Sequence, residues 1–234
     1  MAIPRIHVYV DGFNFYYGLF QGQSPYSPAL KWLNIVKLSE AVCRSQHIEG
    51  SVQAVRYCSA PSLPSATDRE QPMRQELLFR ALRALPEVTI ILGQHVERTK
   101  KGKLFGPDGK PQKYSSRVSA REEKGPDVNL AAYIVSDAAL DEFDVAVVMS
   151  NDSDLENAIR IVRDDFSKDV YIASPQFQMK EVTRALTNAS IRAFKINPSL
   201  LTGCTFSNTV MDEHGALITK PLVWNDKPVS SDEH

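Results

Sequence analysis

The sequence predicts an α/β protein, a Rossmann-like three-layer sandwich with a mostly parallel central sheet of about five or six strands. Short apolar runs, such as residues 6–10 and 145–149, alternate along the chain with helical patterns. This alternation is typical of a parallel sheet that helices cover on both faces. The chain has 234 residues, of which 43% are hydrophobic and 24% charged, so it is long enough to bury one sizeable core.

Hydrophobic periodicity places the elements of the first half of the chain. Strands are expected at residues 6–10, 52–57 and 88–92. A helix is expected at residues 33–45. A longer helix is expected from Asp68 to Ala84, because an apolar stripe that includes Leu78 and Leu82 runs along it and Pro86 follows.

The second half continues the alternation of helices and strands. Pro126 suits the first turn of a helix because proline lacks an N–H group there, and this helix is expected to end near Leu140. A strand follows from Val145. The remaining expected elements are helices at residues 154–166 and 180–188 and strands at residues 170–173 and 191–196.

Residues 98–124 stand apart in composition. They contain nine basic and three acidic residues, a local charge of +6 in a chain of net charge -1. The turn-forming run Gly-Pro-Asp-Gly at residues 106–109 predicts a long hairpin or flexible flap. Phe105 and Tyr114 lie among the charges, a mixture that can contact phosphates and stack on bases. A solvated surface loop without a partner explains the same composition, and the sequence leaves both interpretations open.

We expect one domain over residues 1–200, which includes the basic flap. Residues 201–234 are expected to form a carboxyl-terminal extension, with hairpin strands around His214 and Gly215 and a mobile tail from Asn225 onward. This division follows from the change of pattern after the last expected strand.

Cysteine usage and hydropathy bear on the location of the protein. Cys43, Cys58 and Cys204 lie far apart and match no metal-binding or redox spacing, which favours a reducing, cytoplasmic setting. No segment approaches the roughly 18 apolar residues of a membrane span, and no secretion signal is recognisable. We therefore expect no membrane partner.

Acidic residues follow two of the apolar strands. Asp11 ends the first strand, Asp152 and Asp154 follow the strand from Val145, and Asp127 lies at the start of a helix. Ligands of open α/β sheets bind outside the carboxyl ends of the strands. We therefore expect the carboxylates that follow the two strands to meet at one edge of the sheet.

Each acidic residue also has an ordinary structural explanation. Asp11 before a glycine can be a turn residue, and Asp127 can oppose a helix dipole. Ser153 and Glu156 fit a capping box, with the serine as N-cap. That capping box leaves Asp152 without a structural role.

A cluster of carboxylates needs a compensating charge. Two carboxylates about 5 Å apart repel by roughly 3 kcal/mol at an effective dielectric constant of 20. An all-oxygen ligand set suits a hard cation, Mg²⁺ or Mn²⁺, and disfavours Zn²⁺. A calcium loop is rejected because D-S-D-L-E-N lacks the glycine that such loops require.

Three blocks in this order resemble the signature blocks of NYN domains, which are PIN-like nucleases of the flap-nuclease superfamily. The blocks are D-G-F-N-F-Y-Y at residues 11–17, E-K-G-P-D-V-N-L-A at 123–131 and S-N-D-S-D-L at 150–155. The resemblance covers approximately residues 3–196 and implies a Rossmann-like sheet with a metal-dependent ribonuclease site. On residue-by-residue matching it implies an acidic cluster of Asp11, Asp127, Asp152 and Asp154, lined by Asn14, Ser150 and Asn151.

The predicted function is metal-dependent hydrolysis of RNA phosphodiester bonds. Asp11 and Asp152 are expected to bind Mg²⁺ or Mn²⁺ directly, and Asp127 and Asp154 to bind it through water or to help deprotonate the attacking water. Lys124 is a candidate for holding a neighbouring phosphate, and an exposed lysine without that role is the alternative. The partner is expected to be single-stranded or structured RNA, and the choice of RNA over DNA rests on the family resemblance alone. A homo-oligomer is compatible with the sequence.

Tyr133 is the main departure from the family pattern, since many relatives carry another acid at about this position. This keeps open a second class of function, a catalytically weak PIN-like module that binds RNA or a protein. An aspartyl-phosphate phosphohydrolase is less favoured, because Phe13 stands where such enzymes need a second aspartate. No glycine-rich nucleotide-binding loop follows any strand.

Overall fold

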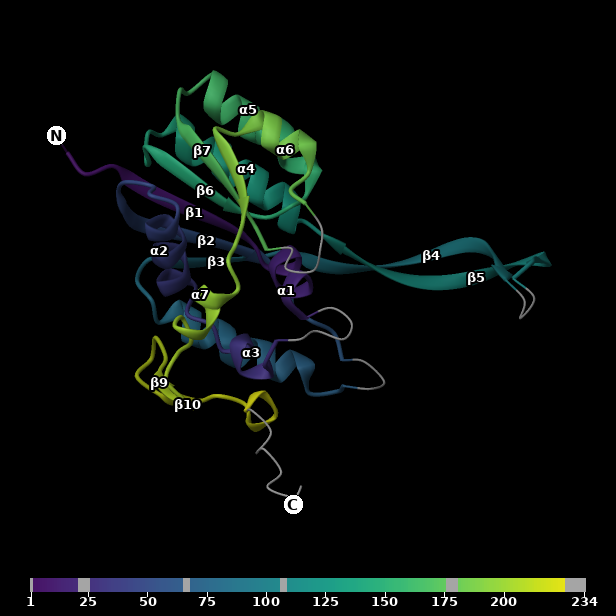
Figure 1. The fold of residues 1–234 in the computed structure, drawn as a ribbon. Helices are drawn as coiled ribbons and strands as arrows, with labels where there is room; N and C mark the ends of the chain where they lie inside the picture. The colour runs from purple at the N-terminus through teal and green to yellow at the C-terminus, as the bar shows by residue number, and fades with distance from the viewer. Residues whose placement is uncertain (1, 21–25, 65–67, 106–108, 176–180, 226–234) are drawn as a thin grey trace, which may run out of the picture.

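The computed structural model describes residues 2–20, 26–64, 68–105, 109–175 and 181–225. Its centre is a six-stranded sheet in which every neighbouring pair of strands is parallel (Figure 1). The strands follow the spatial order β3 (Val88–Leu92), β2 (Ser51–Ser59), β1 (Arg5–Asp11), β6 (Val145–Met149), β7 (Asp169–Ser174) and β8 (Arg192–Lys195). The prediction of an α/β sandwich with a mostly parallel sheet is confirmed.

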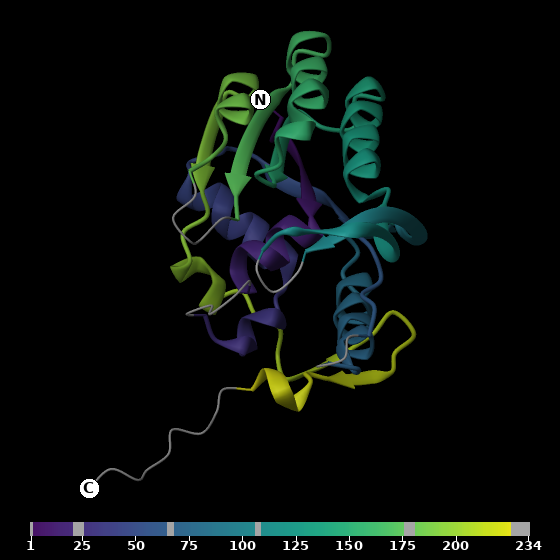
Figure 2. The same cartoon turned by 90° about the vertical axis from the view of Figure 1, so that its right-hand side faces the viewer.

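Helices cover both faces of the sheet, as Figure 2 shows. One face carries α1 (Gly12–Phe20), α2 (Ile35–Ser45) and α3 (Gln71–Arg83), and the other carries α4 (Pro126–Ala139), α5 (Glu156–Asp164) and α6 (Arg184–Ala189). The period-two alternation of β1 supplies both layers, since Val8 and Val10 enter one core and Tyr9 enters the other.

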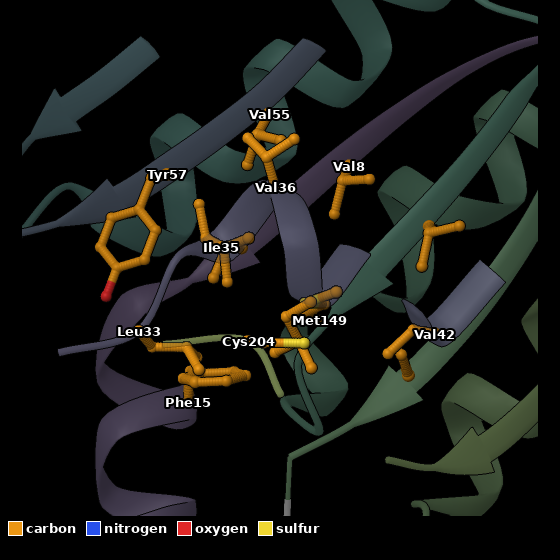
Figure 3. Packing of buried hydrophobic residues seen from close by; sticks show 14 of the residues in the cluster. Val8, Phe15, Leu33, Ile35, Val36, Val42, Val55, Tyr57, Met149 and Cys204 are labelled. Carbon is orange, nitrogen blue, oxygen red and sulfur yellow. The ribbon is translucent and has the colours of Figure 1, made fainter. Parts of the chain in front are cut away.

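The core under α1 and α2 fixes the position of the strand ends. Val8 and Met149, from neighbouring strands, are fully buried there together with Phe15 of α1 and Val42 of α2 (Figure 3). Because Phe15 is buried only four residues after the end of β1, α1 is held close to the carboxyl edge of the sheet. This packing places the residues that follow β1 and β6 side by side.

A long antiparallel hairpin is inserted in the chain between β3 and α4. It consists of β4 (Gln94–Phe105) and β5 (Pro111–Lys124) and projects away from the sheet (Figure 1). At its base a Cβ on Gly93 would lie 2.5 Å from the Lys124 carbonyl oxygen, and Gly125 has a φ of 108°. These two glycines let the chain leave β3 and return directly into α4.

The carboxyl-terminal residues pack on the outer side of the layer that contains α1, α2 and α3. They contain α7 (Ser199–Thr202), the paired strands β9 (Thr209–Met211) and β10 (Leu217–Thr219), and the short helix η3 (Leu222–Trp224). Ile218 and Trp224 are buried against Trp32, which follows the short helix η1 (Pro28–Lys31). The tail at residues 226–234 lies outside the described residues. Among the described helices, none is long and apolar enough to cross a membrane.

Several helices differ from the sequence prediction. No helix is predicted directly after β1; α1 forms there because Phe15 and Leu19, four residues apart, are both buried. The helix expected at residues 180–188 begins only at Arg184. The third helix begins at Gln71 rather than at Asp68, whose carboxylate pairs with Arg74.

Substitution of Gly12 by alanine should destabilise the protein by about 1–3 kcal/mol. The added Cβ would lie 2.9 Å from the Cys58 carbonyl oxygen and 2.9 Å from the Tyr57 ring. Gly102→Ala is the matched control, because nothing lies within 4 Å of the added Cβ there, and its effect should stay within about 0.5 kcal/mol. Urea unfolding of both variants measures the difference, and equal stabilities would contradict the close approach of α1 to β2.

Candidate active site

The sheet order reverses at β1, which has β2 on one side and β6 on the other. In open α/β sheets, such a switch point leaves a crevice at the carboxyl ends of the two central strands. Asp11 is the last residue of β1, and Ser150 directly follows β6. The two residues therefore meet at the position where this fold binds its ligands.

Asp11 is the most deeply buried acid of the site, with 4% of its surface exposed. One carboxylate oxygen accepts a hydrogen bond from the Asn14 backbone N–H at 2.9 Å, and the other accepts one from the Ser150 hydroxyl at 2.9 Å. The first bond is of the kind that an N-cap makes at the start of a helix. The second links the end of β1 to the end of β6.

Asp152 caps the turn that follows β6. Its carboxylate oxygen accepts a hydrogen bond from the Asp154 backbone N–H at 2.9 Å, and its own N–H donates to the Ser150 hydroxyl at 3.0 Å. The predicted capping box is wrong: Glu156 pairs with Arg160 instead. The reason is that a 3-10 turn, η2 (Ser153–Leu155), precedes α5 and moves the cap position back by one residue.

Asp127 completes a compact group with Asp11 and Asp152. A carboxylate oxygen from each residue lies within 4.8 Å of the other two. Asp127 stands in the first turn of α4, directly behind the glycine and proline that end the hairpin. Each of the three acids thus lies at the start of a helix or helical turn, where the exposed N–H groups favour negative charge.

Two acids of the cluster, Asp11 and Asp127, have raised pKa values. Burial raises the pKa of Asp11 to about 6; the charges of Asp127 and Asp152 add to this increase, and the bonds from Asn14 and Ser150 oppose it. Partial burial also raises the pKa of Asp127, together with the charges of Asp152 and Asp154. The ligand atoms are all carboxylate oxygens, so the group fits a hard divalent cation.

The remaining predicted residues lie around this group in different roles. Asp154 is exposed and stands outside the group of three, although it is near enough to influence Asp127. Asn14 accepts a hydrogen bond from the Asn151 backbone N–H at 3.1 Å. The Asn151 side chain is engaged elsewhere, since it donates to the Glu181 carbonyl at 3.1 Å and accepts from the Thr183 N–H.

A groove of about 450 Å³ lies over the acidic group. Lys124 from the base of the hairpin lines it, together with Phe13 and Tyr17 from α1. These two rings stack, with centroids 5.9 Å apart and planes 20° apart. The aromatic residues that follow Asp11 are therefore divided between the core, which receives Phe15, and the wall of the groove.

A second set of ionisable residues lies deeper under α4. Asp137 is 4% exposed and accepts hydrogen bonds from the Tyr9 hydroxyl at 2.9 Å and from Arg56 at 3.1 Å. His7 and Glu142 lie close enough to form a metal-type group with it, but the Arg56 guanidinium already supplies a positive charge. Burial favours a higher pKa for Asp137, yet the hydrogen bonds from His7, Arg56 and Tyr9 outweigh it and lower that pKa.

Tyr133 lies next to Arg56, the cation that pairs with Asp137 in this second set. The Arg56 guanidinium lies over its ring, 5.6 Å from the centroid. The position at which the family resemblance implies an additional acid is therefore occupied by an aromatic partner for Arg56. The sequence gives no signal for this, because Arg56 lies on β2, far from Tyr133 in the chain.

The fold and its acidic edge place the chain among the PIN-like proteins. The model of the NYN domain matches residues 5–197, and the chain therefore belongs to the NYN domain family, a family of PIN-like nucleases. Over 96% of its length the chain is 26% identical to 6-hydroxy-3-succinoylpyridine 3-monooxygenase HspA of Pseudomonas putida, of which it covers 76%. A solved structure of a protein of unknown function from Vibrio parahaemolyticus superposes with a TM-score of 0.49 at 14% identity, covering 84% of this chain and 94% of that one.

Asp11 should make the metal-free protein less stable as the pH rises. Its pKa is about 6 in the folded state against an ordinary 3.8, so it is neutral in both states below about pH 4 and must ionise inside the fold above about pH 6. The difference corresponds to a cost of about 3 kcal/mol. In EDTA, Asp11→Asn should therefore be more stable than the wild type near pH 8 and equally stable near pH 4.

Unfolding in urea across this pH range, with and without Mn²⁺, measures the effect. Bound Mn²⁺ should stabilise the wild type and leave Asp11→Asn nearly unchanged. Asp165→Asn, which replaces an exposed aspartate at the end of α5, serves as the control. A wild type whose stability rises between about pH 4 and pH 8 in EDTA, in parallel with Asp11→Asn, would contradict the raised pKa.

Proposed function

We propose that this protein is a metal-dependent ribonuclease that hydrolyses phosphodiester bonds at the groove between β1 and β6. The observation that supports this most is the group of three carboxylates, Asp11, Asp127 and Asp152, whose ligand oxygens lie within 4.8 Å of one another. They stand at the switch point of a parallel sheet, in a family of PIN-like nucleases. Three acids that crowd at one sheet edge repel one another, and a bound cation would offset that repulsion.

The three clustered carboxylates would hold Mg²⁺ or Mn²⁺. When bound, such an ion lowers the pKa of a coordinated water and offsets the charge that develops on the phosphate. Ser150 positions two of the ligands, because its hydroxyl bonds to the Asp11 carboxylate and accepts from the Asp152 N–H. Asp154, outside the group, is assigned to hold and deprotonate the attacking water.

Asn14 and Asn151 act as positioning residues in this proposal. Asn14 binds the backbone of the loop that carries Asp152, and Asn151 ties the same loop to the segment before α6. Together they fix the loop from both sides, so the carboxylates stay in place without a bound ion. Such preorganisation is what metal-assisted hydrolysis requires.

RNA is the proposed substrate, and the family supports this choice. Lys124 lines the groove beside the acids, and the hairpin that ends in Lys124 belongs to the segment of charge +6. Basic residues next to an acidic centre attract the phosphate backbone without reading its sequence. The three cysteines are buried and unbridged, which supports a cytoplasmic location.

The relative from Pseudomonas putida is named as a monooxygenase of 6-hydroxy-3-succinoylpyridine, and this name suggests a different chemistry. Such a reaction needs a bound reductant or an oxygen-activating cofactor. The sequence carries no glycine-rich dinucleotide loop after any strand, and the acidic group suits a hard cation. We therefore favour hydrolysis over hydroxylation for this chain.

Asp152→Asn and Asp11→Asn should each lower the rate of RNA cleavage in Mn²⁺ by about 100-fold or more, because each removes a charge that acts in the transition state. A fluorescently labelled single-stranded RNA, followed by gel electrophoresis, measures the rate. Asp165→Asn should cleave at the wild-type rate, since that residue is exposed and remote from the groove.

Two results would overturn the proposal. Cleavage that is equal in wild type and both site variants would indicate a contaminating nuclease. A wild type that binds the RNA in Mn²⁺ and never cuts it would instead favour the second class, a PIN-like binding module.

A further inference from the structure

A second cavity, of about 80 Å³, lies beside the acidic groove between α1, α3 and η3. One water-sized group occupies roughly 10–15 Å³ on this measure, so the cavity has room for about five to eight such groups. This is the size of one heterocyclic ring with its substituents. Aromatic side chains that line it include Tyr16, Tyr57, Phe79 and Trp224, and the ion pair of Asp68 with Arg74 lines it as well.

The cavity adjoins the proposed catalytic groove. Phe13 and Tyr17 line both spaces, and their rings stack with centroids 5.9 Å apart. A polynucleotide lying in the groove would therefore pass these two rings beside the cavity. Aromatic walls bind bases of any sequence, because every base offers a flat face for stacking.

One polar group of the cavity lacks a partner that a ligand could supply. Ser62 lines it, and the Ser62 hydroxyl is buried without a hydrogen-bond partner in the described part of the chain. Gln75 holds the backbone around this serine, since it accepts from the Ser62 N–H at 2.6 Å and donates to the Ala60 carbonyl at 3.0 Å. A fixed, unpaired hydroxyl costs free energy unless something binds it.

A positive charge stands at the edge of the same cavity. Lys31 lines it, with its ammonium 5.3 Å from the centroid of the Tyr16 ring and 3.2 Å from the Tyr16 hydroxyl oxygen. A phosphate attached to a ring in the cavity could be met there. Trp224 comes from the carboxyl-terminal extension, beyond residue 197 where the family match ends, so part of this cavity lies outside the matched domain.

We propose that this cavity holds one base of the bound RNA strand, next to the phosphate that is cleaved. The inference rests on the proposed function, because it takes RNA as the occupant of the adjoining groove. The base stacks on the aromatic walls, and its edge offers a hydrogen-bond partner to Ser62. The site adds binding energy that the acidic group cannot provide, since that group repels phosphate when no metal is bound.

The test compares two short single-stranded RNAs of equal length, one normal and one with every base replaced by an abasic ribose. Their affinities for full-length Asp152→Asn are measured by fluorescence anisotropy in EDTA, where neither strand is cleaved. The normal strand should bind about 5- to 150-fold more tightly, the effect expected for one stacked base. Phe13→Ala, which removes part of the wall, and Ser62→Phe, which fills the cavity, should each abolish most of this difference.

Tyr133→Ala, in the same Asp152→Asn protein, is the matched control, because it removes a partly exposed ring that lines neither space. It should keep the preference for the normal strand. Equal affinity for the two strands, or a preference that survives both cavity variants, would overturn the inference. Cleavage of RNA by the wild type in Mn²⁺ is measured separately. If the base preference is absent but the wild type cleaves RNA, the inference fails and the proposed ribonuclease function stands. If the base preference is present but the wild type does not cleave RNA, the ribonuclease function fails and the base site stands.

Discussion

The hydrogen bond between the Ser150 hydroxyl and the Asp11 carboxylate is the contact on which the geometry of the site depends. It joins the ends of β1 and β6 at the point where the sheet order reverses. The same hydroxyl accepts from the Asp152 N–H, so one buried serine connects Asp11 at the end of β1 with Asp152 in the turn after β6. An ionised carboxylate with so little exposure is costly in the absence of a cation, and its raised pKa expresses that cost. The parallel sheet thus brings the carboxyl ends of β1 and β6 together, and the Ser150 hydroxyl holds Asp11 and the Asp152 backbone in place there.

The arrangement of helices explains why acids are tolerated at this edge. Asp11, Asp127 and Asp152 each begin a helix or helical turn, and the backbone N–H groups there partly offset their charge. The hairpin returns through Gly125 and Pro126 to Asp127, so Lys124 and the three acids line one groove. On the far side of the Phe13 and Tyr17 rings the walls become aromatic. The molecule therefore places a charged surface and a stacking surface next to each other, as a binder of single strands needs.

The parallel sheet could be predicted from the sequence, because strands such as β6 are uninterrupted apolar runs and proline or glycine marks the adjoining helices. The meeting of Asp11 with Asp152 also followed from their positions at strand ends, whereas Asp127 was placed with them by the resemblance to NYN domains. The helix α1 could not be predicted, since its stability comes from the burial of Phe15 and not from local propensity. Asp152 as a cap was missed because a 3-10 turn and a capping box share one sequence pattern.

The most direct test of a metal site at the switch point is anomalous X-ray scattering from crystals of the protein soaked in Mn²⁺. The account predicts an anomalous peak coordinated by carboxylate oxygens of Asp11, Asp127 and Asp152, with Ser150 still bonded to Asp11. Soaked crystals without a peak there, with Asp152 turned away to pair with Lys124, would contradict it. A peak at His7, Asp137 and Glu142 instead would show that the wrong acidic group had been assigned.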